Sequence, residues 1–286
     1  MATLTRPEGT IAEDLHVSRR GVAALIAAGY AAIAVGADAA PITTGSDGLA
    51  IDSVTMPDGL PGYVARPAGK GRHPAVIVVN EVFGLHEYIR DTCRRLARAG
   101  YVAIAPEFFH RNEPGRSLAT SQDFAFIMKI VAEAKNDQVM SDVGTTIEWL
   151  QAQPFVDPKR LAITGFCWGG SVVWMAAAQF PQLKAGAAWY GRLTAPKTRT
   201  EVRKYPVEIA GDLKAAVLGL YGALDKGIPV SDVESMQAML KGSKSSIVLY
   251  ADADHGFHAD YRPSYNEKDA KDGWAKMLAH FKKNGV

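Results

Sequence analysis

The strongest chemical signal in the sequence is a short glycine-rich segment built around a cysteine, Gly165-Phe166-Cys167-Trp168-Gly169-Gly170. It directly follows the apolar run 161–164, which is typical of a buried strand. A nucleophile on a sharp strand-to-helix turn sits in a strained backbone conformation, and side chains at the flanking positions would clash, which explains the glycines. Such a turn places Cys167 at a helix N-terminus, where the backbone dipole favours thiolate over thiol. The same pattern also fits a buried structural cysteine beside a glycine-rich turn.

An acid and a histidine follow the cysteine in an informative order. Asp225 comes after the apolar run 216–220, and His255 comes after the run 246–250. Because the carboxyl ends of parallel strands meet at one edge of a sheet, we expect these side chains to lie near Cys167. Nucleophile, acid and histidine is the chain order of α/β-hydrolase triads. In that arrangement His255 takes the thiol proton and later activates water, while Asp225 orients the imidazole.

These segments resemble the dienelactone hydrolases, also called carboxymethylenebutenolidases. The resemblance runs from about residue 50 to the C-terminus and rests on the segments 80–84 and 101–106, the Cys167 turn, the Asp225 loop and 255–257. It implies a single α/β-hydrolase domain with a mostly parallel sheet and helices on both faces. It also implies a Cys-Asp-His triad that acts on small-molecule lactones and esters, with no cofactor.

The resemblance further implies roles for residues around the triad. In the family, a glutamate at the position of Glu81 interacts with the resting thiol and accepts its proton when substrate binds, which protects an exposed thiolate from oxidation. The backbone amides of Val82 and Trp168 would form the oxyanion hole. Phe83 and Tyr190 are candidates for contacts with the substrate. The simpler interpretation of Glu81 is a solvated residue in a loop between a strand and a helix.

Substrate recognition departs from the family pattern at one position. The family's dienelactone enzymes clamp the substrate carboxylate with two arginines, and Arg111 stands in the place of the first. The second is expected four residues after the catalytic histidine, where this chain has Ala259. Arg262 lies three residues further on, and the sequence leaves open whether it reaches the site or lies on the surface. A single arginine would weaken bidentate carboxylate binding, which puts dienelactone itself in doubt as the substrate.

The elements that must position these residues alternate regularly after residue 50. Short apolar runs predict buried parallel strands at 75–79, 101–105, 161–164, 185–189, 216–220 and 246–250. Between and after them we expect helices over 87–99, 142–151 and 265–283, the first as a charged surface helix. The segments 51–56 and 62–66 predict an antiparallel hairpin at the edge of the sheet. With no internal repeat or linker, 40–286 is expected to be one domain.

The first 39 residues have a different character. Arg19 and Arg20 precede the uncharged run 21–37, and Ala37-Asp38-Ala39 has the small residues of a cleavage site. This pattern predicts a twin-arginine export signal over 1–39 and a periplasmic protein without a membrane anchor after cleavage. The alternative is an alanine-rich helix of the folded domain in a cytoplasmic protein.

The composition excludes several classes of protein and partner. The chain has 286 residues, 48% hydrophobic and 22% charged, as in globular proteins. The net charge of +2, without a long basic block, indicates neither nucleic acid nor an anionic membrane as partner. With only Cys93 and Cys167, one disulfide is allowed but a disulfide framework or cysteine-rich zinc site is not. His258 and Asp254 lack further ligands at a recognisable spacing, so no metal is expected.

The sequence therefore predicts a hydrolase of carboxylic esters or lactones that forms a thioester acyl-enzyme on Cys167. Two alternatives remain open. One is an enzyme of the same fold that acts on another bond, such as a thioester or an organophosphate ester. The other is a non-catalytic binding protein that retains the fold. The sequence does not indicate the oligomeric state.

Overall fold

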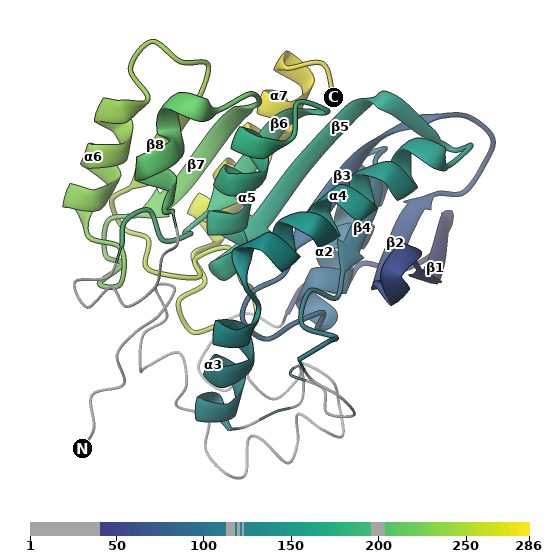
Figure 1. Ribbon diagram of the computed structural model, residues 1–286, viewed down its shortest axis with the longest axis horizontal. Helices are drawn as coiled ribbons and strands as arrows, with labels where there is room; N and C mark the ends of the chain where they lie inside the picture. Colours follow the sequence, from purple (N-terminus) through teal and green to yellow (C-terminus); the bar gives the residue numbers. More distant parts are fainter. Residues whose placement is uncertain (1–40, 113–117, 119–120, 122, 196–203) are drawn as a thin grey trace.

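An eight-stranded, mostly parallel sheet organises the computed structural model, which describes residues 41–112, 118, 121, 123–195 and 204–286 (Figure 1). The strand order is β1-β2-β4-β3-β5-β6-β7-β8. The pairs of β1 with β2 and of β2 with β4 are antiparallel, and all other neighbours are parallel. The strands are β1 (Leu49–Thr55), β2 (Pro61–Pro67), β3 (His73–Val79), β4 (Val102–Pro106), β5 (Val156–Phe166), β6 (Leu183–Trp189), β7 (Ala216–Gly222) and β8 (Ser246–Tyr250).

Helices cover both faces of this sheet. In Figure 1, α4 and α5 lie in front of the strands and α7 lies behind them. On the sheet itself, α2 packs against β2, β3 and β4, while α5 packs against β5 and β6. The helices are α2 (Glu87–Arg98), α3 (Phe124–Glu133), α4 (Asn136–Ala152), α5 (Trp168–Gln179), α6 (Val230–Met239) and α7 (Glu267–Lys283), with short 3₁₀ turns η3 (Pro57–Gly59) and η5 (Pro206–Asp212).

The observed architecture confirms the predicted α/β fold and most element positions. The predicted apolar runs lie in strands, except that Tyr101 precedes β4, and the inner strands are apolar because both of their faces are covered. The prediction of a buried strand over 246–250 is wrong in one respect, because β8 lies at the edge of the sheet and is mostly only half-buried. The predicted hairpin is β1 and β2, at one edge of the sheet. The helix expected over 142–151 begins earlier, at Asn136. The segment 1–39, for which the sequence predicts an export signal, lies outside the described residues.

The prediction of a surface helix over 87–99 is wrong in one respect. Most residues of α2 are buried, and these include the charged Asp91 and Arg94. The cost of burying these charges is offset because Asp91 and Arg94 pair with each other, and Arg94 also pairs with Glu87. Charged side chains on this helix therefore form part of the protein interior.

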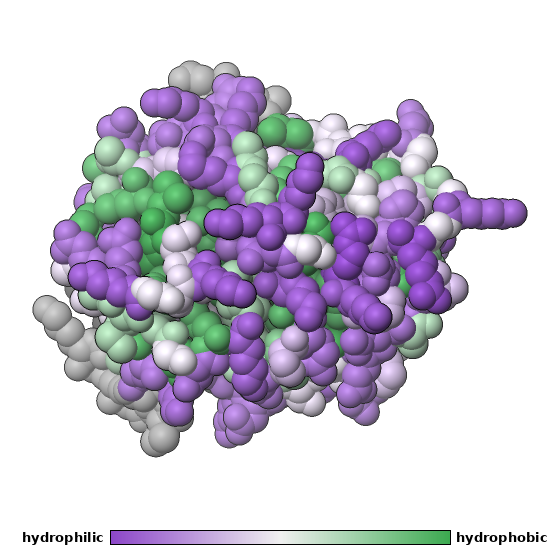
Figure 2. All heavy atoms as spheres, turned by 90° about the horizontal axis from the view of Figure 1, so that it is seen from above, coloured by the Kyte–Doolittle hydropathy of each residue, from purple (hydrophilic) through white to green (hydrophobic). Residues whose placement is uncertain are grey.

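The ends of the sheet differ in character. The strands β5, β7 and β8 end at the lower edge in Figure 1, where the residues predicted to do chemistry follow them. Figure 2 shows the opposite, upper edge, which is mostly hydrophilic, with a hydrophobic area on the side where α6 and β8 lie. No helix in the described ranges is long and apolar enough to cross a membrane.

Candidate active site

Three connections at the carboxyl edge of the sheet carry the residues of the predicted triad. Cys167 follows β5 directly, Asp225 follows β7, and His255 follows β8. Since these strands run parallel, their ends lie at the same edge. All three residues are buried, with exposed fractions of 0%, 3% and 0%.

The backbone at Cys167 has the strained geometry that a strand-to-helix nucleophile turn requires. Its φ is 55° and its ψ is −116°, in a region that residues other than glycine rarely adopt. The turn is held by a hydrogen bond that the Cys167 amide donates to the carbonyl oxygen of Trp189, at 3.1 Å. The helix α5 begins at Trp168, so Cys167 lies at its N-terminus, where the helix dipole favours negative charge.

Glycines flank this turn because other backbone atoms lie very close to it, both within the turn and at the end of β3. A Cβ atom at Gly165 would lie 2.4 Å from the carbonyl oxygen of Gly169. One at Gly169 would lie 2.6 Å from the carbonyl oxygens of Val79, the last residue of β3, and of Asn80, which follows it. These distances are far shorter than van der Waals contact, so the α5 N-terminus can pack this closely on β3 only without side chains.

Asp225 and His255 form a direct hydrogen-bonded pair. The Oδ2 atom of Asp225 lies 2.8 Å from Nδ1 of His255. The other carboxylate oxygen accepts hydrogen bonds from the amides of Gly227 and Ile228, which fix the carboxylate in the loop. With Nδ1 bound to Asp225, Nε2 is the ring nitrogen that remains for Cys167.

The charges around His255 favour its protonated form. Burial opposes a charged imidazole, but the Asp225 carboxylate and then Cys167 raise the pKa of His255 well above its ordinary value. The influence of Cys167 on this pKa reflects how close the thiol lies to the ring. His255 thus carries a positive charge beside Cys167.

The candidates for the oxyanion hole and for substrate contact lie around this pair. Trp168 is the first residue of α5, so its amide has no acceptor within the helix. Val82 is fully buried in the connection between β3 and α2. Tyr190 is also fully buried, and its ring meets that of His255 edge-on at a centroid distance of 5.1 Å.

Glu81 is the centre of a second polar cluster. Its Oε2 atom accepts a hydrogen bond from the Tyr261 hydroxyl at 2.6 Å and lies 3.1 Å from Nε2 of His86. Its Oε1 atom accepts a hydrogen bond from Nη2 of Arg262 at 3.0 Å. The interpretation of Glu81 as a solvated loop residue is therefore wrong, since Glu81 is completely buried. The resemblance implies a contact with the resting thiol, whereas here the carboxylate oxygens bind these three side chains.

The partners of Glu81 keep it ionised. Burial alone would raise the pKa of Glu81, but the charge of Arg262, the His86 contact and the Tyr261 hydroxyl together lower it to about 2. A carboxyl group with this pKa does not accept a proton near neutral pH. Among its partners, Arg262 lowers the pKa of Glu81 most strongly.

Arg262 reaches the site, which resolves what the sequence leaves open. Its exposed fraction is only 2%, and its guanidinium carbon lies 5.4 Å from the ring centre of Phe83. A buried arginine thus stands in the site although the expected position holds Ala259. Phe83, a predicted substrate contact, is half-buried and also meets the ring of His86.

Arg111 is placed differently from Arg262. Its Nη1 atom donates to Oδ2 of Asp142 on α4 at 2.8 Å, and its side chain is one-third exposed. Among the residues that the structure describes, no contact joins it to Cys167, His255 or Glu81.

Sequence reasoning missed two residues that bind Glu81, namely Tyr261 and His86. Tyr261 adjoins Arg262, and His86 follows Glu81 by five positions, so proximity in sequence was the available signal. His258, considered above as a metal ligand, is instead buried against Trp189 and within 2.5 Å of the Tyr88 hydroxyl. The described part of the chain contains no cluster of His, Cys, Asp or Glu that could hold a metal ion.

Comparisons with known proteins identify the family of this chain. The model of the dienelactone hydrolase family matches residues 60–285. A candidate carboxymethylenebutenolidase of Methylorubrum extorquens is 43% identical over 284 residues, which cover 97% of each chain. This chain belongs to the dienelactone hydrolase family. Membership assigns it to a family of ester and lactone hydrolases.

Two further proteins are similar to this chain, one with a solved structure and one with a named lactone substrate. The crystal structure of a candidate dienelactone hydrolase from Klebsiella pneumoniae has a TM-score of 0.77 and 46% identity, covering 82% of this chain and 99% of that chain. A candidate 2-oxo-3-(5-oxofuran-2-ylidene)propanoate lactonase of a Bradyrhizobium species is 29% identical, covering 77% of this chain and 88% of that protein. The fold and the family thus agree.

The close approach at the turn gives a first prediction. Gly169→Ala should reduce the free energy of unfolding by more than about 2 kcal/mol and abolish esterase activity, because its Cβ would meet the backbone that follows β3. The matched control is Gly211→Ala, where a Cβ would have no neighbour within 4 Å. Urea unfolding and ester hydrolysis measure both effects. Equal stability and activity of the two variants would contradict this account of the turn.

The low pKa of Glu81 gives a second prediction. Because its folded-state pKa of about 2 lies below the ordinary 4.5, its charge stabilises the fold above pH 4.5, and this contribution is lost as the pH falls toward 2. This interval corresponds to about 3 kcal/mol. We expect the stability advantage of wild type over Glu81→Gln to shrink as the pH falls, in urea unfolding at a series of pH values. Parallel profiles of wild type and Glu81→Gln would contradict this assignment, and Glu148→Gln, a change at an exposed glutamate, is measured alongside as a control.

Proposed function

We propose that the protein hydrolyses carboxylic esters or lactones through a Cys167–His255–Asp225 triad and a thioester acyl-enzyme. The main support is the combination of a strained turn at Cys167 with a histidine that Asp225 orients at 2.8 Å. Cys167 carries a thiol, which is a suitable nucleophile, at this edge of the sheet. The thiol is close enough to His255 to raise the pKa of the imidazole. A binding protein would have no need for this strain or this pairing.

The first half of the reaction forms the acyl-enzyme. The Cys167 thiolate attacks the carbonyl carbon, and the amides of Trp168 and Val82 stabilise the resulting oxyanion. The C–O bond then breaks, and the leaving alkoxide takes a proton from His255. With a lactone, this alkoxide remains attached to the acyl group.

The second half releases the acid. His255 takes a proton from a water molecule, and the resulting hydroxide attacks the thioester carbonyl. The C–S bond breaks, which restores the Cys167 thiolate beside a His255 that is protonated again, and the acid product gives its proton to the solvent. The thiolate then regains its proton from the group that accepted it at the start of the cycle. Asp225 holds the imidazole in the same orientation throughout, because its other oxygen is fixed by two backbone amides.

We propose further that the substrate carries a carboxylate, which Arg262 binds. Arg262 and Tyr261 already present their donors to a carboxylate, that of Glu81. A substrate carboxylate would compete with Glu81 for the guanidinium. Glu81 would then lose its strongest stabilising charge while it stays buried, so its pKa would rise and it could accept the thiol proton of Cys167. His255, which is already protonated in the resting site, keeps its own proton for the leaving alkoxide. Substrate binding and activation of the thiol would in this way be one event.

The nucleophile is tested by replacing each cysteine in turn. Cys167→Ala should lower kcat/KM for p-nitrophenyl acetate by about 10³-fold or more, because the covalent step is lost. Cys93→Ala is the matched control, since Cys93 is equally buried but lies on α2, where burial raises the pKa of its thiol. Equal rates for both variants and wild type would overturn the proposed mechanism. Parallel assays with a thioester and an organophosphate ester would reveal whether another bond is the preferred substrate.

The anion site is tested with two esters that differ by one carboxylate, p-nitrophenyl hemisuccinate and p-nitrophenyl acetate. Arg262→Ala should lower the ratio of kcat/KM for the hemisuccinate to that for the acetate by about tenfold or more. Arg111→Ala should have a smaller effect, because Arg111 is already bound to Asp142. The exposed Arg160→Ala serves as a control for net charge. An unchanged ratio in Arg262→Ala would contradict a carboxylate-bearing substrate.

A further inference from the structure

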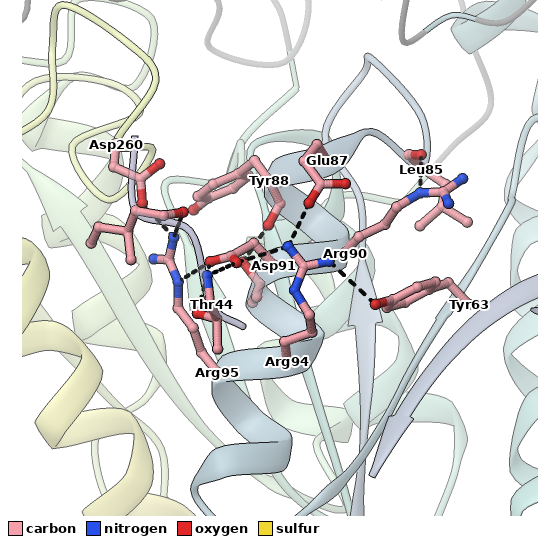
Figure 3. Close-up of polar contacts among 12 residues, drawn as sticks. Thr44, Tyr63, Leu85, Glu87, Tyr88, Arg90, Asp91, Arg94, Arg95 and Asp260 are labelled. Atoms are coloured by element: carbon pink, nitrogen blue, oxygen red, sulfur yellow. Dashed lines mark hydrogen bonds and ion pairs between the residues drawn. The ribbon is translucent and has the colours of Figure 1, made fainter. Parts of the chain in front are cut away.

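A buried cluster of charged residues lies beside the candidate site without taking part in its chemistry. Figure 3 shows it on α2, where Asp91 lies between Arg94 and Arg95. Asp91 has an exposed fraction of only 2%, and Asp260, from the loop after β8, is buried to the same extent. Buried carboxylates are costly unless they are paired, and arginines pair with both of these.

Arg95 connects the two buried carboxylates. Its Nε atom donates to Oδ2 of Asp91 at 2.6 Å, and its Nη2 atom donates to Oδ2 of Asp260 at 2.5 Å (Figure 3). The planar guanidinium makes these bonds from two separate nitrogens held in a fixed geometry, whereas a lysine has a single nitrogen. Asp91 is further fixed by the amide and hydroxyl of Thr44, in the segment that precedes β1. The cluster therefore anchors Asp260 to the middle of α2.

Asp260 belongs to the same short loop as the residues that bind Glu81. Tyr261 and Arg262 follow it directly and turn toward Glu81, while Asp260 turns the other way, toward α2. Tight backbone turns surround it, with hydrogen bonds from the amide of Ala259 to Gly256 and from that of Arg262 to Ala259. In such a closely bonded loop, a shift of Asp260 must move Arg262.

The contribution of the Asp260–Arg95 pair to the position of Arg262 depends on whether a substrate carboxylate is bound. In the structure, Arg262 is held both by the loop and by its bond to Glu81. If a substrate carboxylate replaces Glu81 as its partner, that bond is lost. The Asp260–Arg95 pair then becomes the main charged contact that keeps the loop against α2, together with the bond between His258 and Tyr88.

We propose that Asp260, anchored by Arg95, is a positioning residue that holds Arg262 in place for the carboxylate of the substrate. This inference rests on the proposed function, in which Arg262 binds that carboxylate. It extends the specificity site to a buried ion-pair cluster that does not touch the substrate. The preference for anionic esters therefore depends on α2 as well as on the loop after β8.

The test measures the same ratio of kcat/KM, p-nitrophenyl hemisuccinate over p-nitrophenyl acetate, in variants of the cluster. Asp260→Asn should lower this ratio about tenfold, mainly through a higher KM for the hemisuccinate, because Arg262 is less well ordered. Arg95→Lys should have a similar effect, because the single nitrogen of a lysine does not reproduce the fixed positions of Nε and Nη2 against the two carboxylates. The matched control is Glu87→Gln, which removes a carboxylate from the same cluster but leaves the Asp260–Arg95 pair, and should change the ratio less than about twofold.

A double variant shows whether Asp260 acts through Arg262. In the Arg262→Ala background, Asp260→Asn should not lower the ratio further, since residues that act through one group are not additive. Additive effects would overturn the proposal. So would an equal loss of activity on both esters in Asp260→Asn and Arg95→Lys, which would identify a purely structural role; thermal unfolding of each variant reports the folded fraction. An unchanged ratio in Arg262→Ala alone would instead refute the proposed carboxylate site, and this inference with it.

Discussion

The strained backbone at Cys167 is the constraint on which the rest of the structure depends. A left-handed φ at a residue with a side chain is unfavourable, so the surrounding structure must hold it there. It is held by the hydrogen bond to Trp189 on one side and by the packing of Gly169 on the end of β3 on the other. These contacts require three neighbouring parallel strands, β3, β5 and β6, in their observed order. The thiol stands at the edge of the sheet because of that order.

Charge pairing around this turn divides into two linked systems. His255 and Asp225 stabilise a proton near the thiol, while Arg262 keeps Glu81 ionised. Both systems are buried, so each charge depends strongly on its partner. In the proposed mechanism, the substrate connects them, because it replaces Glu81 at Arg262 and leaves Glu81 able to take the proton of Cys167. In this mechanism Glu81 becomes available as a base only when an anionic substrate binds Arg262.

The sequence was sufficient for the sheet and for the order of the candidate triad, but not for the substrate site. Buried parallel strands such as β3 are apolar throughout, and the glycines beside Cys167 report a local backbone constraint, so both leave a clear pattern. The position of Arg262 depends on the turns between Gly256 and Arg262, which no periodicity describes. The burial of Asp91 could not be predicted from the sequence. One partner, Thr44, is distant in sequence, and the other, Arg95, lies on the same helix, whose many charges resemble those of a surface helix. Long-range charge pairing is a tertiary property.

The covalent role of Cys167 is the central claim, and the mass of the intact protein during turnover tests it most directly. Rapid acid quenching during hydrolysis of p-nitrophenyl acetate should reveal a fraction of protein that carries one acetyl group. Peptide mapping should locate this group on Cys167, and hydroxylamine should remove it, as expected for a thioester. Turnover without any adduct, or an acetyl group on another residue in the turnover-competent protein, would contradict the account.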